Sequence, residues 1–280
     1  MQQTQQEPLS DARARYEHDG YVVIRDVLDA GLVQAAREHV DWLRANHPHL
    51  RAEQLGHTLM THDPFWVRLV SDDHLLDVAE QFIGENIALF ASHYIAKPPF
   101  DGQPVLWHQD GSFWPLEPME VTTLWLAVDD STPENGCMRV IPGSHRMDLQ
   151  NMLARTDVAN VLSAAIDPAL VDESEAVDVV LAPGDVSIHH PNLVHGSNAN
   201  HSPRWRRGLT IRYIPTTTRI ISEAPWPSAF ALRGKIAPGV NDYQPWPRYV
   251  AGTHMPFPDA EAWNERASAW NERTSASSMA

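Results

Sequence analysis

Residues 208–215 read GLTIRYIP, a run rich in β-branched and aromatic side chains. Such a composition predicts a β-strand. Successive side chains of a strand point to opposite faces, so the segment has two distinct sides. Arg206, Gly208, Thr210 and Arg212 share the first side, and Arg207, Leu209, Ile211 and Tyr213 share the second.

Most of residues 86–215 reads in the same way, as short strands broken by Pro, Gly, Asn and Asp. PENG and PGD are turn signals between these runs. The further strand candidates are 87–95, 104–110, 121–128, 137–142 and 178–190. This part of the chain therefore predicts many short strands rather than alternating strands and helices.

The first part of the chain predicts mainly helices. Residues 30–47 carry an apolar stripe at helical spacing, with Asp29 able to cap the start and Pro48 closing the end. Other segments predicted are helices at 11–18, at 74–83 and within 147–177, and a strand at 21–28. Helices followed by many strands favour a mainly β fold, a sandwich or jelly roll with helices outside.

No linker or repeat divides the sequence, so we expect one domain over residues 1–280. Residues 1–9 are polar and expected to fray, and the Pro- and Trp-rich residues 216–280 are expected to cover the rest. No apolar run reaches about 18 residues, and the N-terminus lacks a secretion-signal pattern. The single cysteine excludes an internal disulfide, which favours the cytoplasm.

The formal net charge of −15 argues against a nucleic-acid binder, which needs a basic surface. An acidic surface mildly favours a cationic substrate, but more often it only keeps a protein in solution. The composition does not indicate an oligomeric state.

A candidate metal pair lies in the strand candidate 104–110. On a strand, His108 and Asp110 would share one face and could bind one ion together. His39 and Asp41 have the same spacing, but they lie in the predicted helix 30–47, where residues two apart point in different directions. The spacing alone is therefore not evidence of a site.

A third ligand would come from a distant strand. His195, just before a Gly-Ser turn, is the preferred candidate, and His189 and His190 are alternatives. Two histidines and one carboxylate leave positions open for a co-substrate and dioxygen, the arrangement of non-haem Fe(II) oxygenases. Zinc is the rival metal, because the same ligands with a bound water suit hydrolysis.

An Fe(II) oxygenase that uses 2-oxoglutarate must also bind the far carboxylate of this co-substrate. An arginine fork suits that role. Arg206 follows His195 by eleven residues, at the start of the strand candidate 208–215.

With these residues together, the sequence resembles the phytanoyl-CoA dioxygenase (PhyH) family of Fe(II)/2-oxoglutarate-dependent oxygenases, as a bacterial member. The similarity covers most of residues 17–215. It rests on DGYVVIRDVL (19–28), the HQD of residues 108–110, NGCMRVIPGSH (135–145), HGS (195–197) and the trailing arginine, in that order. The resemblance implies a double-stranded β-helix, a cupin-like jelly roll.

By this resemblance, His108, Asp110 and His195 are the ligands of Fe(II). Arg206 would bind the far carboxylate of 2-oxoglutarate, with Ser197, Trp125 and Lys97 close to it. The residues suggested for the substrate pocket are Phe113, Trp114, His93 and Arg212. Because Asp110 is present, hydroxylation with O2 is expected rather than halogenation.

The expected enzyme is thus a cytoplasmic dioxygenase that hydroxylates a small-molecule metabolite and converts 2-oxoglutarate to succinate and CO2. An acyl-CoA hydroxylase of the same family is an alternative. A zinc-dependent hydrolase and a metal-free jelly-roll binding protein are two further alternatives, from other functional classes.

Overall fold

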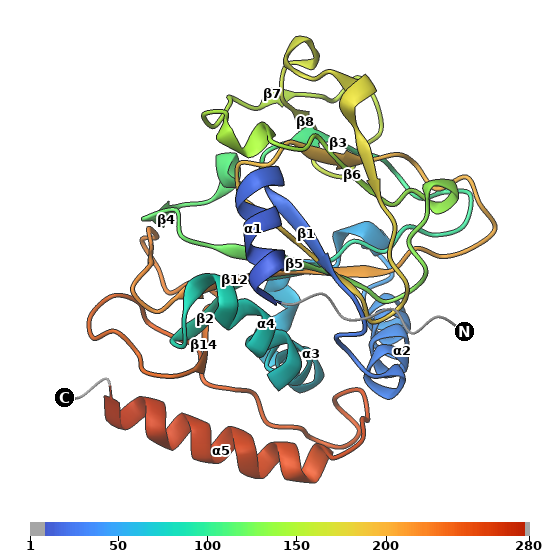
Figure 1. The fold of residues 1–280 in the computed structure, drawn as a ribbon. Coiled ribbons are helices and arrows are strands. Elements are labelled where there is room, and N and C mark those ends of the chain that lie inside the picture. Colours follow the sequence, from blue (N-terminus) through green and yellow to red (C-terminus); the bar gives the residue numbers. More distant parts are fainter. Residues whose placement is uncertain (1–8, 278–280) are drawn as a thin grey trace.

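The computed structural model describes residues 9–277, in which the helices lie on the side of the larger of two antiparallel sheets (Figure 1). The segment expected to fray, 1–9, lies outside the described residues except for Leu9, which begins the first helix. No helix in the described range is long and apolar enough to cross a membrane. The helices are α1 Leu9–Asp19, α2 Ala30–Asn46, α3 Pro64–Val70, α4 Asp73–Ile83 and α5 Ala260–Ser277.

The larger sheet has the strand order β1-β10-β5-β12-β2-β14, and the smaller has the order β3-β11-β6-β9. The larger contains β1 Tyr21–Ile24, β2 Ile87–Tyr94, β5 Thr122–Ala127, β10 Val186–His189, β12 Gly208–Pro215 and β14 Phe230–Arg233. The smaller contains β3 Val105–His108, β6 Met138–Val140, β9 Val177–Val179 and β11 His195–Ser197. Two short ladders join β4 Leu116–Glu117 to β13 Arg219–Ile220, and β7 Leu153–Ala154 to β8 Ala164–Ala165.

Strand β12 has the bounds that its sequence predicts and lies between β5 and β2. Leu209, Ile211 and Tyr213 enter the main hydrophobic core, which α2, α3 and α4 cover. Thr210 and Arg212 face the other way and line a cavity together with residues of the smaller sheet. The predicted alternation is confirmed, and so is the mainly β fold with flanking helices and a jelly-roll core.

Helix α2 forms for the reasons that its sequence suggests. The Asp29 carboxylate accepts hydrogen bonds from the backbone N–H groups of Gly31 and Leu32, at 2.8 and 3.0 Å. These bonds satisfy donors that have no partner within the helix. The apolar stripe is buried in the main core, and the helix ends at Asn46, two residues before Pro48.

The prediction of a helix within residues 147–177 is wrong. This region forms the β7–β8 ladder followed by two short 3-10 turns, Pro168–Leu170 and Glu173–Glu175. The side chains of Asp167 and Asp172 accept backbone N–H groups two residues on. Such local bonds compete with the helical hydrogen-bond pattern.

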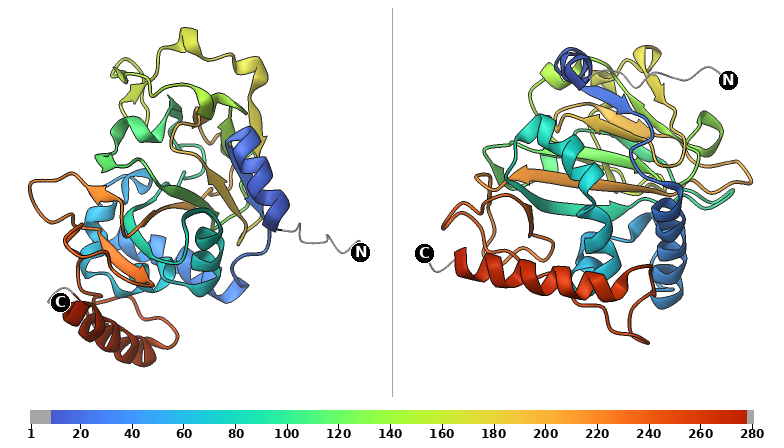
Figure 2. Two further views of the ribbon diagram at one scale, coloured as in Figure 1. Left: turned by 60° about the vertical axis from the view of Figure 1, so that its left-hand side comes forward. Right: turned by 60° about the horizontal axis from the view of Figure 1, so that its bottom comes forward.

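The sequence did not predict α5, because its residues show little apolar periodicity. Its stability comes from packing against residues earlier in the chain. Trp246 stacks on Trp263 and Trp270, with ring centroids 5.1 and 5.0 Å apart. The Arg266 guanidinium donates to the Ser71 carbonyl at the end of α3. Figure 2 shows α5 lying along the helical side of the molecule.

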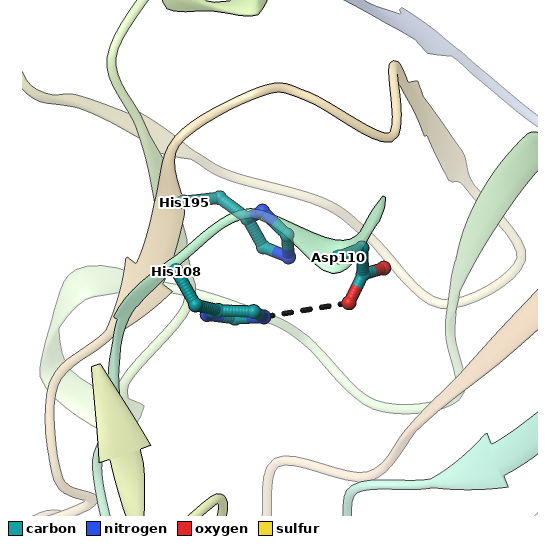
Figure 3. A group of neighbouring side chains, drawn as sticks. All are labelled: His108, Asp110 and His195. Atoms are coloured by element: carbon teal, nitrogen blue, oxygen red, sulfur yellow. Dashed lines mark ion pairs between the residues drawn. The ribbon is translucent and has the colours of Figure 1, made fainter. Parts of the chain in front are cut away.

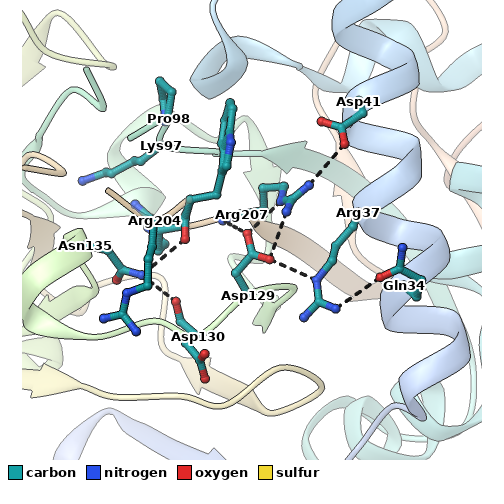
Figure 4. Close-up of polar contacts among 12 residues, drawn as sticks. Gln34, Arg37, Asp41, Lys97, Pro98, Asp129, Asp130, Asn135, Arg204 and Arg207 are labelled. Atoms are coloured by element: carbon teal, nitrogen blue, oxygen red, sulfur yellow. Dashed lines mark hydrogen bonds and ion pairs between the residues drawn. The ribbon is translucent and has the colours of Figure 1, made fainter. Parts of the chain in front are cut away.

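Asp129, just after β5, ties α2 to the start of β12 (Figure 4). Its carboxylate accepts the Nε–H groups of Arg37 and Arg207 at 3.0 and 2.7 Å, and also the backbone N–H of Arg207 at 3.0 Å. Asp41 also contacts Arg207, at 3.5 Å, but its side chain is 58% exposed against 13% for Asp129. The buried carboxylate should therefore matter much more than the exposed one.

Replacing Asp129 by Ala leaves two arginines without their shared acceptor. We expect this change to lower the free energy of unfolding by about 1–3 kcal/mol. The matched Asp41→Ala variant should stay within about 0.5 kcal/mol of wild type. Urea unfolding near neutral pH measures both values, and equal losses in the two variants would contradict this account.

Candidate metal centre

Three buried side chains converge on one point between the sheets (Figure 3). His108 is the last residue of β3, Asp110 follows it by two residues, and His195 begins β11. Their ligand atoms all lie within 4.8 Å of one another. The His108 Nε2 lies 3.5 Å from the Asp110 Oδ1, and the two imidazole centroids are 4.1 Å apart.

The pairing of strands explains why these residues meet. β3 and β11 are antiparallel neighbours, and His195 is the register partner of His108. The sequence predicted Asp110 within the strand, but β3 ends at His108. Asp110 instead begins a 3-10 turn that extends to Phe113. Gln109 between them keeps an extended backbone, with φ −117° and ψ 122°. The alternation of side chains therefore continues to Asp110 and places both ligand candidates on one face.

The histidines are held in the tautomer that a metal requires. The Nδ1 of His108 lies 2.9 Å from the Leu106 carbonyl, and the Nδ1 of His195 lies 2.9 Å from the Leu193 carbonyl. Each Nδ1–H donates to its carbonyl, which leaves Nε2 as a free acceptor. Burial, together with the nearby His108, holds the pKa of His195 well below its usual range. The His195 ring is therefore neutral, as a ligand must be.

The carboxylate is ionised in spite of its burial. Burial raises the pKa of Asp110, but the Arg212 charge and the nearby side chains of His108 and His189 together hold that pKa well below its usual range. The Asp110 Oδ2 is buried and has no hydrogen-bond partner among the described residues. Two imidazoles with free Nε2 atoms and one carboxylate with a spare oxygen fit a divalent iron.

The second His-x-Asp pair behaves as the helix predicts. His39 is buried, and its Nε2 lies 2.8 Å from the Asp63 Oδ2. Asp41 points outward and contacts Arg207. The prediction that these two side chains point in different directions is confirmed.

The two alternative histidines lie on opposite sides of the chain. His189 lines the cavity, with Nε2 3.6 Å from the Asp110 Oδ2. His190 is directed away from the cavity and packs near Tyr16 and His145, with ring centroids 6.1 and 5.4 Å away. His189 is therefore a neighbour of the candidate centre, whereas His190 is not.

The candidate centre opens into a cavity that residues of both sheets line. Arg206 lines this cavity and is 2% exposed. Its Nη1 donates to the Ile95 carbonyl at 3.3 Å, and its guanidinium lies 4.9 Å from the centre of a Trp125 ring. No carboxylate of the described residues lies within ion-pair distance, and Nε has no partner. Burial lowers the pKa of Arg206 to about 10, so the side chain stays charged at neutral pH.

Ser197 and Trp125 line the same cavity as Arg206. Lys97 lies behind this wall rather than in it. The Lys97 Nζ donates to the Ser197 Oγ at 2.7 Å and also to the Asn198 carbonyl. Burial and the nearby Arg206 hold the pKa of Lys97 well below its usual range.

The residues suggested for the substrate pocket divide in two. Arg212 lines the cavity, but Phe113, Trp114 and His93 are not among its lining residues. Phe113 is 45% exposed, with its ring centroid 6.3 Å from that of His108. Trp114 and His93 contact the Arg212 guanidinium from outside the cavity. The lining residues that the sequence did not single out are Ile95, Val105, Met138, Leu162, Thr210 and Gly196.

Gly208 is a further residue whose role the sequence did not indicate. A Cβ at this position would lie 2.2 Å from the Trp125 Cζ2. The indole therefore lies directly against the backbone of β12. A glycine in a predicted strand is the signal of such close approach.

Comparison with known proteins agrees with this geometry. The model of the family described as phytanoyl-CoA dioxygenase (PhyH) matches residues 16–208. A probable alpha-ketoglutarate-dependent hypophosphite dioxygenase from Stutzerimonas stutzeri is 36% identical over 148 residues, covering 52% of this chain and 51% of the relative. This chain thus spans about half the length of that relative.

Three further matches, one relative and two solved structures, extend over most of their own length. An ectoine dioxygenase from Sphingopyxis alaskensis is 28% identical over 265 residues, covering 84% of this chain and 86% of the relative. A structure of EctD from S. alaskensis with 2-oxoglutarate and 5-hydroxyectoine has a TM-score of 0.62 at 25% identity, covering 85% of this chain and 88% of that one. A non-heme monooxygenase, ThoJ, has a TM-score of 0.70 at 23% identity, covering 93% and 96%, and supports the fold.

The environment of His190 leads us to expect a loss of stability in mild acid. Its Nδ1 accepts the backbone N–H of Asn192 at 3.1 Å, and burial lowers its pKa from 6.5 to about 4. As pH falls below about 6.5, the unfolded chain takes up a proton that the folded chain does not, so the free energy of unfolding falls. Urea unfolding between about pH 7 and pH 5 should show a shallower decline in His190→Gln. Identical slopes would contradict the assignment.

Proposed function

The chain belongs to the phytanoyl-CoA dioxygenase family, and from this we propose that it is an Fe(II)- and 2-oxoglutarate-dependent dioxygenase that hydroxylates a C–H bond of a small-molecule metabolite. The observation that carries the proposal is one cavity holding both a buried His-Asp-His cluster and a buried arginine without an acidic partner. In the balanced reaction, substrate, 2-oxoglutarate and O2 give hydroxylated substrate, succinate and CO2.

The proposed iron ligands are His108, Asp110 and His195. Bound iron supplies the oxidising chemistry, in which dioxygen is reduced while 2-oxoglutarate and the substrate are oxidised. The protein supplies imidazoles whose Nδ1–H groups already donate to backbone carbonyls. It also supplies an ionised carboxylate in a buried setting, so this ligand need not lose a proton before metal binds.

The far carboxylate of 2-oxoglutarate is proposed to bind Arg206. The orphaned Nε–H and the remaining guanidinium donors suit a planar, bidentate acceptor. Because the Ser197 Oγ accepts from Lys97, its own hydroxyl hydrogen is free to donate to the same carboxylate. Lys97 would thus orient Ser197, and Trp125 would form the flat wall beneath Arg206.

The substrate would enter beside Phe113, whose exposed ring lies close to His108. Trp114 and His93 would act through Arg212, which they contact. We favour a free metabolite over an acyl-CoA, because the chain has only two lysines, Lys97 and Lys235, and its net charge of −15 gives no indication of a site for the phosphates of CoA. The chain is proposed to act in the cytoplasm, and its net charge of −15 opposes a nucleic-acid partner.

Removing a metal ligand should abolish turnover. In His108→Ala and Asp110→Ala, we expect succinate formation to fall to the level of the metal-free protein, and Fe(II) affinity to fall by about 100-fold or more. His201→Ala is the matched control, since His201 is exposed and is not one of the proposed ligands. Assays with added Fe(II) or Zn(II) separate an oxygenase from a hydrolase. Full activity without iron, or with zinc in its place, would overturn the proposal.

Arg206 should control the affinity for 2-oxoglutarate. Arg206→Ala removes charged hydrogen bonds worth about 1.5–3 kcal/mol each, so KM for 2-oxoglutarate should rise by about 10- to 100-fold. In Arg206→Lys this KM should rise less. In Arg204→Ala, which changes an exposed neighbour, it should equal that of wild type. Succinate release against 2-oxoglutarate concentration measures these values. An unchanged KM in Arg206→Ala would contradict the assignment.

A further inference from the structure

The cavity contains a second buried arginine, Arg212, which the proposed binding of iron and 2-oxoglutarate does not use. It lies on β12, six residues after Arg206, which precedes the strand and lines the same cavity, and it is 8% exposed. Six residues of extended chain span about 20 Å, so the two side chains leave the strand at well separated points. One arginine is enough for the far carboxylate of 2-oxoglutarate.

The hydrogen bonds of Arg212 leave part of its guanidinium free. Nη1 donates to the Thr210 Oγ1 at 2.9 Å and lies 3.2 Å from the His93 Nδ1. Nη2 forms an ion pair with the Asp110 Oδ2 at 3.6 Å, which is beyond hydrogen-bond distance. Nε is buried and has no partner in the described part of the chain. Donors therefore remain for a group that enters the cavity.

Neighbouring side chains outside the free donors fix the position of this guanidinium. Trp114 lies against it, with the guanidinium carbon 5.1 Å from the centre of a ring, and His93 and Thr210 hold Nη1. A fixed orientation reduces the entropy that a ligand must overcome when it binds. Arg212 thus has the properties of a prepared anion site rather than of a surface arginine.

The balance of charges in the cavity also favours an anionic ligand. Of the described residues that line it, Asp110 alone is acidic. Once a divalent metal and doubly charged 2-oxoglutarate are bound, Asp110 and the two arginines leave one positive charge without a partner. A buried charge without a counter-charge is unfavourable. The cavity is therefore opposite in sign to the protein as a whole, with its net charge of −15.

We propose that Arg212 binds an anionic group of the primary substrate, a carboxylate or a phosphorus oxyanion, and so selects organic acids over neutral or cationic metabolites. This inference rests on the proposed function, since it assigns the substrate class of the same cavity. Ile95, Val105, Met138 and Leu162 form the apolar part of the wall. They suit a carbon skeleton attached to that anionic group.

The test measures anion binding to the protein loaded with Mn(II) and 2-oxoglutarate under anaerobic conditions. Acetate and inorganic phosphate are titrated separately by calorimetry, so that the two arms distinguish a carboxylate from a phosphorus oxyanion. Wild type should bind at least one of them at one site. Arg212→Gln should weaken this binding at least about tenfold, while Arg212→Lys should retain part of it and the exposed-site control Arg204→Gln all of it.

Three results would overturn the inference. They are no binding of either anion by wild type, undiminished binding by Arg212→Gln, and a large loss of 2-oxoglutarate affinity in that variant, which would assign Arg212 to the co-substrate. Unchanged 2-oxoglutarate affinity also shows that the variant is folded. Iron-dependent succinate formation by wild type, even without substrate, tests the proposed function separately. If that formation is present and only anion binding is absent, the inference alone fails.

Discussion

The alternation of side chains along β12 is the constraint on which the rest of the molecule depends. Leu209, Ile211 and Tyr213 hold the strand to the helix-covered core, so its register cannot slip without moving apolar groups into the cavity. The same register presents Arg206 and Arg212 to the cavity. The position of the charged groups is therefore determined by the burial of apolar ones on the other side of the strand.

Sequence patterns were sufficient wherever a local period determined the structure. The bounds of β12, the stripe and cap of α2, and the different fates of His39 and His108 all follow from residues close in the chain. Sequence patterns were insufficient where contacts between residues far apart in the chain determine the structure. Helix α5 depends on Trp246, and the position of Lys97 behind Ser197 depends on a contact between residues one hundred apart.

The same limit applies to the candidate centre. The sequence indicated His108, Asp110 and His195, and β3–β11 pairing brings them together. It did not indicate that His189 would lie beside Asp110 while its neighbour His190 would not, because that depends on which face of β10 meets the cavity. Nor did it indicate that Gly208 would give room to Trp125. Both facts depend on strands that are far apart in sequence.

The order of strands in the larger sheet has a consequence for how the chain folds. No two hydrogen-bonded neighbours in that sheet are consecutive strands: β1 pairs with β10, and β2 pairs with β12 and β14. Each pairing closes a long loop, which slows assembly relative to a fold built from hairpins. During synthesis, the early strands have no partners until residues beyond 186 have emerged from the ribosome. Helices α2, α3 and α4 are made first and can shield apolar residues of β2 in the interval, which would limit aggregation of the incomplete chain.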